Sequence, residues 1–182
     1  MPKLLKTYMG NDDMVITPKY KTSLKTGSSL KYPVVMKAPF DYTEYVLQFE
    51  IKTDDVIAIG DIAAVELSDL LIVSTSVATA AVIVMDTAHN KSILEGHGLT
   101  VNKTSQFKDG DVIDCLLLIP GLILSMKVQP KADIIIGQKL IANDTAGELT
   151  NGVTAGSVIG MALTRMDWTA ETSTHYTAVL VK

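Results

Sequence analysis

The fold is decided by residues 131–165, which read KADIIIGQKLIANDTAGELTNGVTAGSVIGMALTR. Four turn-forming pairs divide this stretch into short runs of β-branched and aliphatic residues; the pairs are Asn143-Asp144, Ala146-Gly147, Asn151-Gly152 and Ala155-Gly156. This punctuation predicts strands over residues 134–136, 138–142 and 158–163. An isolated hairpin is marginally stable in water, so these strands need a wider sheet or a neighbouring subunit to cover them.

Two glycines, Gly137 and Gly160, lie within or between these apolar runs. A glycine inside a strand pattern favours a β-bulge or a close approach of two backbones. We therefore expect a tightly curved sheet.

Other strands are expected on both sides of this segment. Residues 112–119 and 122–128 are continuous apolar runs separated by Pro120-Gly121, and they predict the most buried hairpin of the domain. Residues 176–181 predict the strand that closes the sheet. Residues 34–36 are bounded by prolines, which limits them to an edge strand or a connector.

The middle of the chain also has the pattern of strands. Residues 45–52 alternate between apolar and polar side chains, which predicts a strand with one wet face. Residues 56–59 and the nearly all-apolar residues 77–85 predict two more strands, the second of them central. Residues 61–73 partly fit helical spacing, but we interpret them as strand, loop and strand.

Composition sets the broad class. The chain has 182 residues, of which 47% are hydrophobic and only 5% aromatic, so small aliphatic side chains must fill the core. Cys115, the one cysteine, lies in an apolar run and is expected to be a buried thiol. No signal-peptide pattern and no apolar run of about 18 residues is present, so we expect folding in a cytoplasm and no membrane span. The prediction is an all-β protein, a compact β-sandwich or β-barrel-like domain with short hairpins over residues 33–182.

Residues 1–32 are expected to form an extended basic arm. They hold six lysines against two aspartates, a local charge of +4, whereas the whole chain carries −4. These lysines are our candidate contacts with an acidic partner surface, and they are Lys3, Lys6, Lys19, Lys21, Lys25 and Lys31. A leader or a simple disordered tail is the alternative. Arg165 is the only arginine, which together with the net charge disfavours a nucleic-acid partner.

No constellation for catalysis is recognisable. The chain lacks a nucleophile elbow, a phosphate-binding loop and the HExxH metal motif, so we expect no enzyme activity, cofactor, metal or small-molecule substrate. His89 and His97 are predicted to lie on two loop tips joined by a short strand at residues 92–94, in structural or solvated roles. His175 is predicted to lie in a loop. Trp168 is interpreted as a packing residue or an exposed contact anchor.

The pattern GQKLIANDTAGELTNGVTAGSVIGMAL, within residues 129–182, resembles the closing segment of the capsid decoration proteins of tailed bacteriophages, also called cement or head-stabilisation proteins. In that family a glycine precedes a "KL-hydrophobic-hydrophobic" strand, a "G-acidic-Leu-Thr" strand follows, and an "IG-hydrophobic-Ala-Leu" strand leads to the final strand. The corresponding elements here are residues 137–142, 147–150, 158–163 and 176–181.

The resemblance implies a function at a surface. It implies a virion protein on the capsid exterior that bridges major capsid protein subunits, often as a homotrimer, and is made in the host cytoplasm. The long arm and extended middle of this chain leave the base of a head fibre open as an alternative. A receptor- or carbohydrate-binding β module ranks lower, because Tyr42, Tyr45 and Trp168 are the only aromatic residues available for an exposed cluster.

Overall fold

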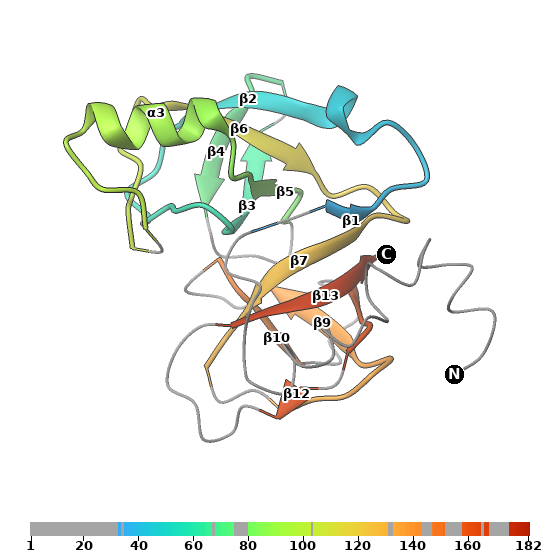
Figure 1. Cartoon of the computed structure of the whole chain (residues 1–182). Coiled ribbons are helices and arrows are strands. Elements are labelled where there is room, and N and C mark those ends of the chain that lie inside the picture. Colours follow the sequence, from blue (N-terminus) through green and yellow to red (C-terminus); the bar gives the residue numbers. More distant parts are fainter. Residues whose placement is uncertain are drawn as a thin grey trace.

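Strands dominate the computed structural model (Figure 1). It describes residues 33, 35–66, 68–74, 80–102, 104–130, 133–142, 147–151, 158–164, 166–167 and 175–182, so residues 1–32 lie outside it. Thirteen strands, one α-helix and one 3-10 helix occur in the described part, and the strands close into two small barrels. The predicted all-β, barrel-like class is confirmed. None of the described helices is long and apolar enough to cross a membrane.

The first barrel comes from the middle of the chain. Its strands are β2 (Val46–Ile51), β3 (Ile62–Glu66), β4 (Leu71–Ser74), β5 (Val82–Val84) and β6 (Val112–Leu117), and they close in the order β2-β4-β3-β5-β6. The β2–β4 pair is parallel and the other pairs are antiparallel. The short 3-10 helix η1 (Tyr42–Tyr45) leads into β2.

The second barrel comes from the C-terminal third. Its ring consists of β7 (Ile123–Val128), β10 (Leu149–Asn151), β9 (Lys139–Ala142), β11 (Val158–Ala162) and β13 (His175–Val181), and β13 pairs with β7 to close it. The edge strand β1 (Val35–Lys37) adds to β7 outside the ring, as predicted for residues 34–36. Two short strands, β8 (Asp133–Ile134) and β12 (Met166–Asp167), pair separately.

Two hydrophobic clusters fill the barrels. Phe49, Ile51, Ile72 and Ile113 belong to the cluster of the first barrel. The larger cluster holds the inward side chains of the second barrel together with four residues contributed by the first barrel or the segment after β5: Ile62, Ile83, Met85 and Leu116. Apolar side chains of the two barrels therefore pack together in this larger cluster.

The predicted hairpin over residues 112–128 is wrong. β6 pairs with β2 and β5 in the first barrel, whereas β7 pairs with β1, β10 and β13 in the second. Pro120-Gly121 is indeed a turn, with Gly121 at φ +94°, but it carries the chain from one barrel to the other. Two consecutive apolar runs show that both strands are buried without showing which strands they pair with.

The predicted loop tips and short strand at residues 86–99 are also wrong. The segment forms helix α3 (Ala88–Gly96), which begins where the Thr87 hydroxyl accepts a hydrogen bond from the Asn90 backbone N–H at 3.1 Å. Leu94 is fully buried, and the Asn90 side-chain amide donates to the Met85 and Asp114 carbonyl oxygens. The capping threonine was the available sequence signal for this helix.

The remaining strand predictions have mixed outcomes. Residues 61–73 form strand, turn and strand as expected, and β2 buries Phe49 and Ile51 while Gln48 stays exposed. Residues 56–59 contribute only a single bridge, between Ile57 and Phe107. β5 is shorter than the prediction, and residues 77–79 lie outside the described part.

The two glycines of the deciding segment have different roles. A Cβ on Gly160 would lie 2.4 Å from the Leu180 carbonyl oxygen, and the β11–β9 register shifts at this point, so the predicted bulge and close approach are both present. Gly137 instead lies in a turn at φ +84°, with nothing within 4 Å of an added Cβ. Glycine is favoured at position 137 because the backbone is in the left-handed region, and not because a side chain would meet a neighbouring atom.

We expect Gly160→Ala to lower the free energy of unfolding by about 1–3 kcal/mol, as overpacking of a filled core does. The added methyl group would meet backbone, which moves less easily than a side chain. Chemical denaturation followed by circular dichroism measures the change. Gly96→Ala in α3 is the matched control, because nothing lies within 4 Å of its added Cβ and no loss of stability is expected there. Equal losses in the two variants would contradict this account.

Candidate binding surface

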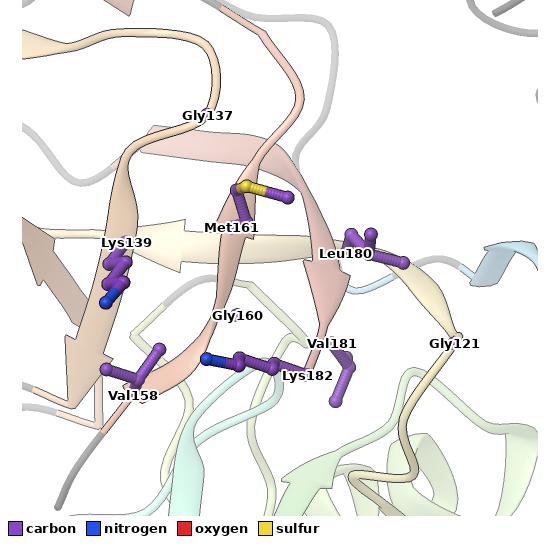
Figure 2. Close-up of a pocket in the computed structure, with 9 residues that line it drawn as sticks. All are labelled: Gly121, Gly137, Lys139, Val158, Gly160, Met161, Leu180, Val181 and Lys182. Atoms are coloured by element: carbon purple, nitrogen blue, oxygen red, sulfur yellow. The ribbon is translucent and has the colours of Figure 1, made fainter. Parts of the chain in front are cut away.

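An apolar hollow lies on the outside of the second barrel, over β9, β11 and β13 (Figure 2). Its volume is about 410 Å³, and it is lined by Gly121, Gly137, Lys139, Val158, Gly160, Met161, Leu180, Val181 and Lys182. Gly160 contributes no side chain, so the middle of its floor is backbone. The hollow is therefore made mostly of aliphatic and glycine residues.

Exposed aliphatic side chains occur in the hollow and in the turn that contains Gly137. Ile135 is 52% exposed and Ile136 is 65% exposed in the turn before β9, and Met161 is 37% exposed on β11. Two backbone hydrogen bonds hold that turn against β11: the Gly137 N–H donates to the Ala162 carbonyl oxygen, and the Ala162 N–H donates to the Gln138 carbonyl oxygen. We call Ile135, Ile136, Met161 and the lining of the hollow the apolar face. A clustered apolar surface on a soluble protein is characteristic of a contact site for another macromolecule.

The apolar face carries two positive charges. Figure 2 shows Met161 and Leu180 on neighbouring strands, whereas the ammonium groups of Lys139 and Lys182 lie toward Val158. Among the described residues that line the hollow, none is an aspartate or a glutamate. The surface is suited to a partner that combines aliphatic contacts with nearby acidic groups.

The aromatic residues named as possible carbohydrate contacts have packing roles where they are described. Tyr42 and Tyr45 pack against the larger hydrophobic cluster, and the Tyr45 ring meets Phe40 edge to face at 5.2 Å between centroids. Trp168 lies outside the described residues. The described part therefore offers little support for a carbohydrate site.

The histidines occupy separate places. His89 Nε2 lies 2.9 Å from the Val112 carbonyl oxygen, and His97 Nε2 lies 3.2 Å from an Asp111 carboxylate oxygen. His175 is the first residue of β13 and is buried, so its predicted loop position is wrong. Among the described residues no group of three metal-ligating side chains is present. Cys115 is buried as predicted, and burial raises the pKa of its thiol.

Sequence reasoning missed a buried ion pair between the barrels. Lys127 on β7 donates from Nζ to Asp61 Oδ1 at 2.5 Å, and the two side chains are only 10% and 6% exposed. Asp61 Oδ2 accepts from the Ala58 backbone N–H at 2.7 Å. Burial raises the pKa of Asp61 to about 6, against the opposing effect of the Lys127 ammonium.

The backbone closes tightly around this pair. A Cβ on Gly147 would lie 2.7 Å from Asp61 Cβ, and a Cβ on Gly60 would meet the Tyr176 hydroxyl and Lys127 Cε. The Ile62 N–H donates to the Gly147 carbonyl oxygen at 2.9 Å, which links the start of β3 to the start of β10. We call Gly60, Asp61, Lys127, Gly147, Glu148 and Tyr176 the junction.

The structure does not test the predicted basic contacts. Lys3, Lys6, Lys19, Lys21, Lys25 and Lys31 lie outside the described residues.

We expect Lys127→Met to destabilise the fold by about 3–5 kcal/mol near neutral pH, because it leaves a carboxylate buried without its cation. Unfolded aspartate titrates near 3.8, and losing Lys127 raises the folded pKa of Asp61 beyond about 6. The folded variant then binds more protons than the unfolded chain between these values. Its stability falls as pH rises through that window and is recovered as pH is lowered.

Urea denaturation at several pH values measures this effect. The double variant Asp61→Asn/Lys127→Met is the control, since it has no carboxyl group to titrate at this position. A difference between the single and double variants that does not change with pH would show that Asp61 is not the responsible group.

No protein-family model matches the chain, and no curated protein matches it. Among solved structures, the chain is similar to the N base of head fiber gp8.5 in bacteriophage phi29, at 14% sequence identity and a TM-score of 0.40. That similarity covers 75% of this chain and 94% of the phi29 chain.

Proposed function

We propose that this chain is a structural protein of a tailed-bacteriophage virion. It binds the outer surface of the icosahedral capsid and stabilises the mature shell by bridging major capsid protein subunits. It makes and breaks no bond in its partner. The observation that carries the proposal is where the family-like residues lie in the fold.

Those residues form one connected unit. The four matching segments coincide with β9, β10, β11 and β13, which are consecutive in the ring order β10-β9-β11-β13 of the second barrel. Strands that are close in sequence commonly neighbour in a sheet, and these four make up most of the ring of the second barrel. The apolar face lies on three of these same strands.

A capsid presents many identical binding sites. A protein can therefore bind it tightly through several contacts that are each weak. A stiff protein that touches several subunits gains effective concentration with each added contact. Because it binds the assembled shell and not dispersed subunits, it stabilises the shell by linkage. The lysines of residues 1–32 would add an electrostatic contribution that weakens with salt.

We also propose a homotrimer, with the apolar face covered by a second copy of the chain. Residues 33–182 carry a net charge of about −8, the difference between −4 for the chain and +4 for residues 1–32. A second copy therefore offers abundant carboxylates to Lys139 and Lys182 next to the aliphatic contact. Burial of Ile136, the most exposed large apolar side chain described, would contribute to the stability of the assembly.

The base of a head fibre is the second candidate, and the two-barrel architecture favours it. The first barrel is a complete closed sheet in addition to the one that carries the resemblance. A base needs one surface for the shell and another for the fibre. In this case the second barrel would contact the capsid while the first carries further protein.

Purified protein is expected to co-sediment with undecorated mature capsids. Capsids that lack the protein are expected to release DNA at a lower temperature than decorated ones, measured by the fluorescence of a DNA-binding dye during heating. Replacing the six lysines of residues 1–32 with glutamine should weaken binding most at low salt. Equal release temperatures with and without bound protein would exclude the cement role and leave the fibre base.

The trimer has its own test. Light scattering of the full chain is expected to give three times the chain mass, and Ile136→Lys/Met161→Lys is expected to give the monomer mass. Val56→Lys is the matched control, because Val56 is 58% exposed in the segment between β2 and β3 and is not part of the apolar face. A monomeric natural chain, or a trimer that survives the double change, would refute this interface.

A further inference from the structure

We propose that Lys127 and Asp61 condense to an amide, so that the two barrels become covalently joined within one chain. Three features of the junction support this modification: contact between an amine and a carboxyl group, a hydrogen-bond donor on the second carboxyl oxygen, and a third ionisable side chain beside them. The proposal does not depend on the capsid role.

The reacting groups are already in contact. Lys127 Nζ lies 2.5 Å from Asp61 Oδ1, so the carboxyl carbon is only one bond further away. Productive geometries place reacting atoms about 3–3.5 Å apart. Both side chains are almost fully buried, and the tight backbone at Gly60 and Gly147 leaves them little room to separate.

Burial of the pair weakens the charged form of Asp61. Attack requires a neutral amine and a protonated acid, and a single proton transfer from Lys127 Nζ to Asp61 produces both. Loss of water around the pair disfavours the two charges, in the direction of the raised pKa of Asp61.

The second carboxyl oxygen is held by a backbone donor. The Ala58 N–H donates to Asp61 Oδ2 at 2.7 Å. When Nζ adds to the carboxyl carbon, negative charge develops on this oxygen. A fixed N–H at that position stabilises the tetrahedral intermediate as an oxyanion hole does.

We assign the proton transfers to Glu148. It is buried, it follows Gly147, whose added Cβ would lie 2.7 Å from Asp61 Cβ, and its charge raises the pKa of Asp61. It takes a proton from the attacking amine and returns it to the leaving oxygen. The bond from Nζ to the carboxyl carbon forms and the bond from that carbon to Oδ1 breaks. Oδ1 leaves as water, the two hydrogens lost from the amine and the acid leave with it, and no oxidant or reductant is consumed.

Intact-mass spectrometry of the folded full-length protein tests the proposal directly. The expected mass is lower than that of the sequence by one water molecule, and proteolysis is expected to yield a branched peptide that joins the Asp61 and Lys127 segments. A mass equal to the uncondensed sequence after prolonged incubation, with both peptides recovered in linear form, would overturn it.

Two variants separate chemistry from packing. Lys127→Arg keeps a cation beside Asp61 but has no amine, so its mass should equal that of its own sequence. Glu148→Gln keeps the size of the side chain and should slow condensation after refolding by about 10²-fold or more, as loss of a general acid–base does. An unchanged rate in the folded Glu148→Gln protein would remove Glu148 from the reaction, and condensation in Lys127→Arg would refute the assignment to Lys127.

Discussion

The arrangement of the two barrels depends on one buried ion pair. Asp61 belongs to the first barrel and Lys127 to the second, and each is nearly excluded from water. A buried charge without its partner costs several kcal/mol. Each barrel therefore holds a charged group whose counter-charge lies in the other barrel, which disfavours any arrangement that separates them. The shared apolar cluster favours contact between the barrels, whereas the ion pair favours one relative position of the two.

The sequence predicted the local structure better than the pairing. The strands predicted at residues 138–142 and 158–163 are present as β9 and β11, because turn residues and aliphatic runs act within a few residues. The strand predicted at residues 134–136 is wrong, since β8 ends at Ile134 and residues 136 and 137 form a turn. The partners of β6 and β7 did not follow, since a continuously apolar strand is buried whichever barrel it joins. The helix at residues 88–96 was missed for a related reason. Its stability comes from Leu94 and Asn90 contacting the first barrel, and only the Thr87 cap marks it locally.

The sequence analysis identified neither the junction nor the apolar face, and only the junction had a usable sequence signal. Gly60-Asp61 has the pattern of an ordinary turn, and nothing near it indicates that the aspartate is buried. Lys127 was the available signal, because a lysine inside the run ILSMKV requires a partner when the strand is buried on both faces. The apolar face was hidden because Ile135 and Ile136 are indistinguishable from core residues until the turn at Gly137 places them outside.

The proposed role on a capsid would require a protein that resists deformation between its contacts. The apolar face lies on β9, β11 and β13, whereas the junction lies at β7, at the start of β10 and at Tyr176 near the other end of β13. β13 thus runs from the junction to the apolar face as a single hydrogen-bonded strand. A force applied to the first barrel reaches that face through Lys127 and β13 without crossing a flexible connector. An amide between Lys127 and Asp61 would strengthen this connection between the barrels. Water can replace the partners of an ion pair, but it does not displace a covalent bond.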